Sequence, residues 1–370
     1  MNVVHIFKDC YPPTTGGIEQ HMSLLCRRLA RTMDVTILTP SRSRRRMEEM
    51  IGQVRYLRVP EFGRYASAPL CPTAPLELHR LHSDIVHLHF PNPMGDLAHL
   101  LGAAGTPLVV TYHADIIKQK AFLPFYRPVL NLIFGKARKI IFSAAENIAF
   151  SSVPPAFRHK CTVIPFGVEL EAFSPRGPEL TEINAIRKEG GEALLLFVGA
   201  ARYYKGIEVL LRAMVHVKGR LILAGRDTQS DTLQSHARDL GIHDRILFCG
   251  EVSESRLRVL LNAADVFVLP SIDRCETFGI GQLEAMACSK PVVSTDLHTG
   301  VRTVNRHGVT GLVVSAGDPD ALSGALNLMV SNPELRAELG RNARLQVELQ
   351  FGADRMVSKT IEVYREALQR

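Results

Sequence analysis

Two glutamates in the second half of the chain are the residues best placed to do chemistry. Glu276 and Glu284 have seven residues between them, in a segment that runs from an apolar strand through a glycine-containing loop into a helix. This spacing places one carboxylate in the loop and the other about two turns along the helix, which suits two separated hydroxyl groups of one ligand. Paired carboxylates are also typical of glycosidases. The surrounding glycines and the helix start favour an anionic ligand.

A basic pair lies earlier in the same half. Arg202 and Lys205 follow the apolar run that ends in Phe197-Val-Gly199, and Lys205 is followed by Gly206 at the expected start of a helix. Cationic side chains and free backbone N–H groups that converge in this way suit a diphosphate. The segment is neither a G-x-G-x-x-G turn nor a P-loop, so a dehydrogenase or a kinase loses its main support.

A glycine pair marks the first half. Gly16 and Gly17 follow the opening strand and lead into an amphipathic helix expected over Gln20 to Ala30. Paired glycines let backbone N–H groups approach an anion at a helix N-terminus. A plain tight turn explains the pair equally well.

Histidines gather near strand ends in the same half. His113 and Asp115 directly follow the hydrophobic run Val109-Val-Thr-Tyr112, where they are either structural or part of a site. His87 and His89 alternate along their strand and therefore share one face. Two histidines with no added carboxylate make a poor metal site, and the seven scattered cysteines form no C-x-x-C pair. We therefore expect no metal site.

The elements that must position these residues form two series. Short apolar or β-branched runs alternate with helical patterns, which predicts parallel sheets and an α/β fold. The expected strands are 3–7, 35–38, 85–89, 108–112 and 140–143 in the first series, and 194–198, 220–224, 246–249, 266–269 and 291–294 in the second. Doubly wound sheets bind ligands beyond the carboxyl ends of their strands, and the loops described above lie there.

Length and composition agree with two folded domains. The chain has 370 residues, of which 46% are hydrophobic and 22% charged. We place the domain boundary near residue 174. The segment Ala353 to Gln369 repeats apolar residues at helical spacing, so this helix needs a surface to cover. The opening run Val3 to Phe7 is closed by charged residues, which indicates a strand rather than a signal peptide. The odd number of scattered cysteines suits a reducing cytosol.

The formal net charge of +7 is concentrated in the first half. Residues 1–190 hold 23 Lys and Arg against 16 Asp and Glu, whereas residues 191–370 hold 21 of each. The densest basic cluster is Arg42, Arg44, Arg45 and Arg46, which suits a solvated loop, an anionic membrane or a phosphate-bearing substrate. No basic and aromatic motif of a nucleic-acid binder is present, so we expect no nucleic-acid partner.

Taken in chain order, these loops resemble the retaining, GT-B-fold glycosyltransferases of the large family 4 type, which includes bacterial mannosyltransferases acting on lipid-linked glycans. The resemblance covers nearly the whole chain. Its most specific element is the setting Glu276-Thr-Phe-Gly followed by Glu284-Ala-Met-Ala, joined by Gly16-Gly17 and Lys205-Gly206. It implies two Rossmann-like doubly wound domains facing across a cleft. Residues 1–174 would bind the acceptor, 175–352 the nucleotide sugar, and the helix 353–370 would pack back on the first domain and act in a hinge.

The resemblance also implies roles for the residues of the second half. Glu284 would bind the ribose hydroxyls and Glu276 the donor sugar. Arg202 and Lys205 would neutralise the diphosphate leaving group in place of a metal ion. Many members carry a basic residue where this chain has Ala200, two places before Arg202. The backbone near sugar and phosphate would be that of Phe278, Gly279 and Ile280.

In the first half, the resemblance makes His113 the residue that hydrogen-bonds the transferred sugar. Gly17 would lie by the phosphates and the acceptor, with Gly16 and Asp115 as further substrate-binding residues. No protein nucleophile is evident, so the acceptor hydroxyl would attack on the face from which the leaving group departs.

The activity implied is metal-independent transfer of a hexose, with GDP-mannose as the first choice of donor, to a lipid-linked glycan in polysaccharide or O-antigen synthesis. No cofactor is expected. The enzyme would be cytoplasmic, at the inner face of the cytoplasmic membrane, in peripheral contact with anionic lipid. A sugar-nucleotide 2-epimerase of the same fold and a non-catalytic sugar-nucleotide sensor are the alternatives.

Overall fold

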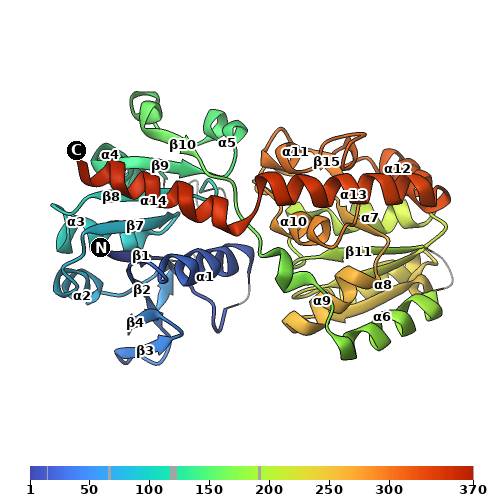
Figure 1. The fold of residues 1–370 in the computed structure, drawn as a ribbon, viewed down its shortest axis with the longest axis horizontal. Coiled ribbons are helices and arrows are strands. Elements are labelled where there is room, and N and C mark those ends of the chain that lie inside the picture. The colour runs from blue at the N-terminus through green and yellow to red at the C-terminus, as the bar shows by residue number, and fades with distance from the viewer. Residues whose placement is uncertain (15, 66–67, 117–122, 191–192, 370) are drawn as a thin grey trace. The chain divides into compact units, whose positions relative to one another are not determined.

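The chain divides into two compact units, which Figure 1 shows in a computed structural model that describes residues 1–14, 16–65, 68–116, 123–190 and 193–369. Unit 1 comprises Met1–Gly167 together with Ala353–Arg370, and unit 2 comprises Val168–Gly352. The change of unit therefore comes earlier than the boundary expected near residue 174. The reason is local, because the N–H of Val168 already donates to the carbonyl of Phe351 (2.9 Å), in unit 2.

An eight-stranded sheet forms the centre of unit 1, with the order β10-β9-β8-β7-β1-β2-β4-β3. Its neighbouring strands are parallel except for β3, which runs antiparallel to β4 at one edge. The strands of this unit, including a separate two-stranded ribbon of β5 and β6, are β1 (Asn2–Ile6), β2 (Asp34–Ser41), β3 (Met47–Ile51), β4 (Val54–Pro60), β5 (Arg64–Tyr65), β6 (Ala68–Pro69), β7 (Ile85–Phe90), β8 (Leu108–Tyr112), β9 (Ala137–Phe142) and β10 (Cys161–Val163).

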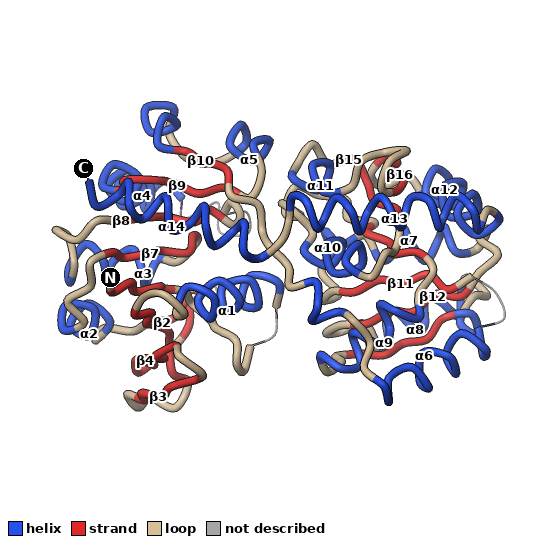
Figure 2. The backbone as a smooth tube through the Cα atoms, viewed as in Figure 1, coloured by secondary structure: helices blue, strands red, loops and turns tan. Residues whose placement is uncertain are grey.

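Helices cover both faces of this sheet (Figure 2). They are α1 (Gly17–Leu29), α2 (Ala74–Arg80), α3 (Pro93–Gly102), α4 (Leu123–Lys136), α5 (Ala145–Phe150) and α14 (Ala353–Gln369). One core layer joins the sheet to α2, α3 and α4, and the other joins it to α1 and α14. The helix α14 buries Met356, Val363 and Tyr364 in the second layer, which is the surface that its apolar periodicity requires.

The edge hairpin of β3 and β4 was not foreseen. The arginine-rich segment was expected to be a solvated loop or a surface for an anionic membrane or phosphate, and no strands were predicted after it. Glutamates of β3 pair with arginines of β4, with Arg55 bonded to Glu48 (2.7 Å) and Arg58 to Glu49 (2.8 Å). Charged residues are common on edge strands, where they discourage pairing with a further chain.

Unit 2 is built on a six-stranded, wholly parallel sheet with the order β13-β12-β11-β14-β15-β16. Numbered within the unit this is 3-2-1-4-5-6, the order of the doubly wound dinucleotide-binding fold. The chain reverses its direction of winding between β11 and β14. The strands are β11 (Leu194–Val198), β12 (Arg220–Ala224), β13 (Ile246–Gly250), β14 (Val266–Leu269), β15 (Val292–Asp296) and β16 (Gly311–Ser315).

The helices of unit 2 also lie on both faces of the sheet. They are α6 (Gly177–Gly190), α7 (Ile207–Met214), α8 (Asp231–Asp239), α9 (Glu254–Ala263), α10 (Ile280–Ala287), α11 (Gly300–Val304), α12 (Pro319–Ser331) and α13 (Pro333–Gln350). The core on one face is closed by α7, α8 and α12, while α9 and α10 pack on the other. Along the described part of the chain, no helix combines the length and the apolar character needed to cross a membrane.

Candidate active site

An ion pair lies at the reversal point of the unit 2 sheet. Lys205 follows β11 and Glu276 follows β14, and the Nζ of Lys205 is 2.5 Å from an Oε of Glu276. The hydroxyl of Ser271 donates to the same oxygen (3.0 Å). Burial opposes the charge on Lys205, but the neighbouring Glu276 outweighs it, so the pKa of Lys205 is raised above its usual value. Lys205 is therefore a cation at neutral pH, held against the side chain of Glu276.

Glycine geometry brings the two loops together. Gly206 separates Lys205 from α7 and has a φ of 67°, a conformation that favours glycine. A Cβ at this position would lie 2.0 Å from the carbonyl oxygen of Pro270, which belongs to the loop after β14. The loops are also joined directly, because the N–H of Ile272 donates to the carbonyl of Tyr204 (2.8 Å). The close backbone approach thus fixes Lys205 beside Glu276.

The helix α10 begins directly after this loop and carries Glu284. Gly279, with a φ of 73°, precedes its first residue Ile280, and Phe278 is buried. Glu284 is half-buried, and desolvation followed by repulsion from Glu254 raises its pKa to about 7. The helix α10 therefore carries both a carboxyl group with a pKa close to neutral pH and a helix N-terminus, which favours negative charge.

Arg202 differs from Lys205 in its surroundings. It precedes the short helical turn Tyr203–Lys205, and its side chain is exposed. The two basic residues predicted together are thus on one turn, with Lys205 held against Glu276 and Arg202 on the surface.

In unit 1, His113 is buried at the carboxyl end of β8. Its Nε2 is 2.9 Å from Nδ1 of His89, and the two rings are stacked. Burial, followed by the neighbouring His21 and Lys8, keeps the pKa of His113 well below its usual value. His113 is therefore a neutral ring at physiological pH, able to donate or accept one hydrogen bond at each nitrogen according to its tautomer.

Asp115 does not join His113 in this unit. Its Oδ1 accepts hydrogen bonds from the hydroxyl of Tyr112 and from the hydroxyl of Ser152 (2.7 Å), and the N–H of Ser152 lies 3.0 Å away. These bonds tie the end of β8 to the segment after α5. His113 and Asp115 are two residues apart in the sequence and thus have different hydrogen-bond partners in space.

The glycine pair lies at the start of α1, as the pattern predicted. Gly16 is the residue before the helix and has an extended backbone, and Gly17 is exposed. A Cβ at Gly16 would come within 2.3 Å of a carboxylate oxygen of Glu19. This acidic side chain occupies the helix start, where an anion would otherwise be favoured.

Several polar residues around these positions were missed by sequence reasoning. Ser271 contacts Glu276, and Thr299 donates to the backbone carbonyl of Glu276 (2.8 Å). In unit 1, His5 and Tyr364 join the histidines of β7. His5 lies opposite His87 on the neighbouring strand. A histidine in the first strand was therefore a usable signal once β1 and β7 were known to be neighbours.

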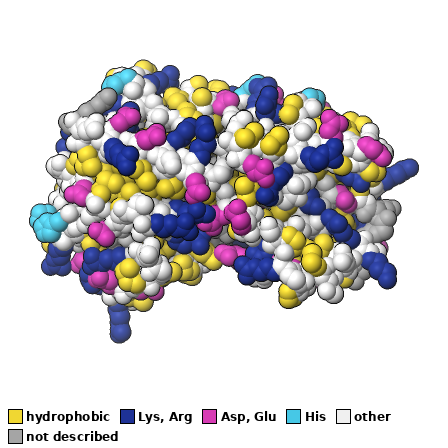
Figure 3. All heavy atoms as spheres, viewed as in Figure 1, with side chains coloured by type: hydrophobic (Ala, Val, Ile, Leu, Met, Phe, Trp, Pro, Cys, Tyr) yellow, Lys and Arg dark blue, Asp and Glu magenta, His cyan; other side chains and the backbone are white. Residues whose placement is uncertain are grey.

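The basic excess of the first half is partly neutralised. Arg46 pairs with Glu77 (2.9 Å) and with Glu48, whereas Arg42, Arg44 and Arg45 are exposed and make no ion pair with the described residues. On the face drawn in Figure 3, Lys and Arg side chains are scattered among Asp and Glu and do not form one patch.

Two Rossmann-like units, one of them carrying an ion pair and glycine-rich loops at its reversal point, define a nucleotide-binding α/β protein. The family model "Glycosyltransferase Family 4" matches residues 15–172, and "Glycosyl transferases group 1" matches residues 179–346. The chain belongs to this family of glycosyltransferases. It is a hexosyltransferase, and the family predicted from the loops is confirmed.

Relatives and solved structures agree with this assignment. The chain is 30% identical to O-antigen chain mannosyltransferase C of Escherichia coli, over 100% of this chain and 99% of the relative. It is 32% identical to D-rhamnosyltransferase WbpZ of Pseudomonas aeruginosa, over 95% and 93%. Sucrose-phosphate synthase of Thermosynechococcus elongatus superposes with a TM-score of 0.79 at 21% identity, covering 100% and 99% of the two chains, which confirms the GT-B fold.

Proposed function

We propose that the protein transfers a mannosyl or related hexosyl group from a nucleoside diphosphate sugar to a hydroxyl of a lipid-linked glycan, in O-antigen or lipopolysaccharide synthesis, with retention of anomeric configuration. GDP-mannose is our first choice of donor. The names of the two full-length relatives support the sugar class, since one is an O-antigen chain mannosyltransferase and the other a D-rhamnosyltransferase.

The observation that carries the proposal is the ion pair of Lys205 with Glu276. In the reaction, the bond between the sugar C1 and the diphosphate oxygen breaks, while the acceptor oxygen bonds to C1 on the same face and its proton passes to the departing oxygen. Lys205 stabilises the negative charge that develops on the diphosphate, and Glu276 accepts hydrogen bonds from the sugar. Arg202 adds positive charge, the carboxylate of Glu284 holds the ribose, and His113 hydrogen-bonds the transferred sugar.

Metal independence is part of the proposal. A fixed ammonium group supplies the charge stabilisation that a divalent cation supplies in other transferases. At the diphosphate position that we assign here, Lys205 is the cation held in place by a carboxylate, and the exposed Arg202 lies on the same loop.

The test measures release of nucleoside diphosphate from UDP-, GDP- and ADP-sugars in EDTA, with and without a lipid-linked acceptor extract. We expect acceptor-dependent release from GDP-mannose, and an α-linked product by NMR of the anomeric proton. Loss of activity in EDTA with recovery by Mg²⁺ would overturn metal independence, and a β-linked product would overturn retention. Conversion of donor without acceptor would favour the epimerase, and donor binding without conversion the sensor.

We also propose that the acceptor is reached by peripheral attachment at the inner face of the cytoplasmic membrane, through the exposed Arg42, Arg44 and Arg45. Exposed arginines near an anionic surface each contribute about 1 kcal/mol to binding. Replacing these three arginines by Ser should weaken binding to phosphatidylglycerol vesicles. The matched control replaces the exposed Arg238, Arg306 and Arg341 of unit 2, which removes the same charge. Equal loss in both variants would contradict attachment through this loop.

A further inference from the structure

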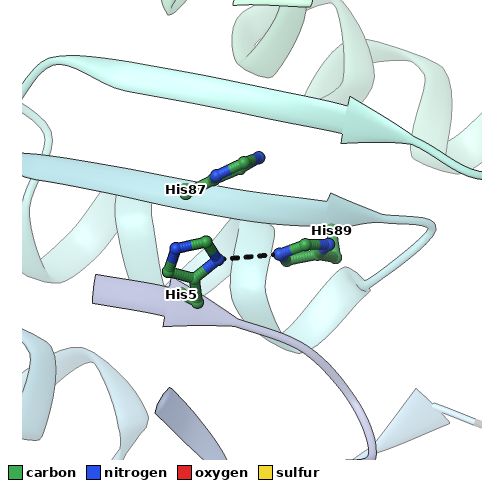
Figure 4. A group of neighbouring side chains, drawn as sticks. All are labelled: His5, His87 and His89. Carbon is green, nitrogen blue, oxygen red and sulfur yellow. Dashed lines mark hydrogen bonds between the residues drawn. The ribbon is translucent and has the colours of Figure 1, made fainter. Parts of the chain in front are cut away.

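The sheet of unit 1 has two different sides. On the side closed by α1 and α14, strands β1 and β7 carry the buried side chains of His5, His87 and His89 (Figure 4). The other side is covered by α2, α3 and α4, which join the sheet in one core layer. Because the inward surfaces of these three helices are buried in that layer, their outward surfaces lie together on the outside of unit 1. The proposed function gives this outer surface no role.

Large apolar side chains are concentrated on this outer surface. Phe125 on α4 and Leu101 on α3 are the two most exposed large hydrophobic side chains among the described residues, at 86% and 75%. Leu97 lies one turn before Leu101, Leu132 lies about two turns after Phe125, and Leu76 is on α2, and all three are exposed. The helix α3 packs against both α2 and α4, so these side chains are on neighbouring helices. We call the five side chains the apolar face.

The helices α3 and α4 are apolar on both their inward and their outward sides. The inward side of α3 buries Met94 and Ala98, and the inward side of α4 buries Leu130 and Ile133. A surface helix normally has an apolar stripe toward the core and polar residues toward water, whereas a helix that is apolar all round is usually buried. Exposed apolar surface of this kind marks a site of interaction. The apolar face therefore needs a partner that covers it.

The charged groups around the apolar face are basic. The exposed charged residues of α3 and α4 are Arg127 and Lys136, whereas Asp96 of α3 is buried. The ammonium group of Lys160 donates to the last carbonyls of α4, which places a further cation at the end of this helix. Residues 123–160 contain six Lys and Arg against one acidic residue, so most of the net charge of +7 lies in this segment. The surroundings of the apolar face thus favour a negatively charged partner.

The apolar face also adjoins the arginine loop to which we assign membrane attachment above. Arg46, at the end of that loop, pairs with Glu77 of α2 (2.9 Å), and α2 packs against α3. Glu77 pairs with Arg80 as well (3.1 Å), so the acidic residue of α2 is buried and neutralised. The arginine loop and the apolar face therefore meet along α2.

A second copy of the chain and a lipid bilayer are the two occupants that an apolar face suggests. Contact between two copies of this face would bring Arg127 and Lys136 of each copy together, and like charges across an interface oppose association. A bilayer with anionic headgroups offers hydrocarbon to the leucines and the phenylalanine and negative charge to the basic residues around them. The combination of apolar and basic groups favours the bilayer.

We propose that the apolar face inserts into the interfacial region of an anionic membrane, with Phe125 and Leu101 at the acyl-chain boundary and Arg127 and Lys136 among the headgroups. The helices α3 and α4 then lie along the membrane surface. The inference rests on the proposed function for the choice of membrane, which is the one that holds the lipid-linked acceptor. It deepens the proposed attachment, because the arginine loop acts through charge that salt screens, whereas apolar insertion persists in salt.

The first test uses the absence of tryptophan from the chain, so that a single introduced tryptophan reports its own surroundings. In Phe125→Trp, emission should shift to shorter wavelength on vesicles of phosphatidylglycerol and phosphatidylcholine, and lipids brominated on their acyl chains should quench it. Leu349→Trp is the matched control, because Leu349 is an exposed leucine on α13 of unit 2, and its emission should not change. Unchanged emission from Phe125→Trp in vesicle-bound protein would overturn the inference.

The second test removes the two most exposed side chains. Leu101→Gln combined with Phe125→Gln should weaken cosedimentation with these vesicles by about 10- to 100-fold, at low and at high salt alike. The matched control is Leu345→Gln combined with Leu349→Gln, which removes two exposed leucines of α13 and should leave binding unchanged. Equal loss in both double variants would contradict insertion at this face. A wild-type dimer in sedimentation equilibrium that only the first double variant dissociates would identify a second copy as the occupant and overturn the inference.

Comparison with the arginine variant separates this inference from the proposed function. If replacing Arg42, Arg44 and Arg45 by Ser abolishes vesicle binding while the variant of Leu101 and Phe125 binds normally, the apolar face has no part in attachment and the inference fails alone. If the arginine variant still binds at high salt and the other does not, the inference stands and attachment through the loop fails. Vesicle binding needs no turnover, so failure of the proposed transfer reaction leaves both results unchanged.

Discussion

The two units share one winding order but place their polar groups differently. In unit 2, Lys205 and Glu276 meet as a charged pair in the loops beyond the sheet, at the reversal between β11 and β14. In unit 1, the strands at the corresponding reversal, β1 and β7, carry neutral histidines inside the core. Burial explains the difference, because a charge is retained only where a partner compensates for desolvation, whereas imidazoles can become neutral and hydrogen-bond one another.

The largest expected effect comes from removing the charge of unit 2. Lys205→Met should lower kcat by about 10²–10³-fold, because the developing diphosphate charge loses its stabilising ammonium group. It should also reduce the free energy of unfolding of unit 2 by about 3–5 kcal/mol, since Glu276 is left buried without its cation. Turnover assays and urea unfolding measure the two effects.

The double variant Lys205→Met with Glu276→Leu separates the effect on activity from the effect on stability. It should recover much of the stability, because no uncompensated charge remains, while activity stays lost. An active Lys205→Met enzyme would remove the ion pair from the proposed mechanism.

Acid should affect the two units in opposite directions. Burial lowers the pKa of His5 and of His21 to about 3, below the value in the unfolded chain, so unfolded unit 1 binds more protons. Its stability is therefore complete above about pH 6.5 and falls as the pH drops toward 3, by about 1.4 kcal/mol per pH unit for each such histidine. Asp96, whose pKa burial raises to about 7, offsets one of them. His87, His89 and His113 add to the loss.

In unit 2, the raised pKa of Glu284 gives the opposite sign. The folded state holds a proton that the unfolded state releases, so this group contributes stability at low pH that is lost as the pH rises through 7. Hydrogen exchange of the β7 and β14 amides, corrected for intrinsic rates at about pH 5 and pH 7, should show weaker protection at pH 5 in β7 alone. Equal loss in both strands would show that the histidines do not set the difference.

The loop contact beneath Lys205 is expected to be sensitive to one methyl group. Gly206→Ala introduces a Cβ 2.0 Å from the carbonyl of Pro270, at a positive φ. We expect a loss of about 2–3 kcal/mol in unfolding free energy and reduced activity, because the loop carrying Lys205 must shift. Gly241→Ala is the matched control, with a φ of 68° and open space around the added Cβ. If both variants lose the same stability, backbone strain alone accounts for the effect.

The smallest effect concerns the ionisation of Glu284. Ribose hydroxyls are donors to a carboxylate, so binding of the donor nucleotide should tighten as the pH rises through about 7 and then level off, changing about tenfold per pH unit below it. Calorimetry at about pH 6 and pH 8 measures the change, which Glu284→Gln should abolish. Replacing the neighbouring Glu254 by Gln should move the midpoint downward, because Glu254 raises the pKa of Glu284. A midpoint that stays in place would exclude this coupling.

Much of the fold follows from local sequence patterns. All ten strands expected from apolar runs are present, because parallel strands buried on both faces are continuous hydrophobic segments. The helix Ala353–Gln369 was bounded correctly by its apolar periodicity. The β3 and β4 hairpin was missed, since β3 is an exposed strand with two adjacent glutamates and no apolar run, next to an arginine-rich loop.

The candidate site divides in the same way. The motif around Glu276 and Glu284 and the Lys205-Gly206 pair are contiguous in sequence, so the residue types alone indicated an anionic ligand and a family. The sequence by itself thus determined which strands form and which loops carry charge. Only the tertiary structure decided that Lys205 contacts Glu276 and that Asp115 accepts a hydrogen bond from Ser152. It also decided that Tyr364 is hydrogen-bonded to His5, which is 359 positions away in the sequence. Such contacts depend on strand order and helix docking, which bring together residues that no local pattern relates.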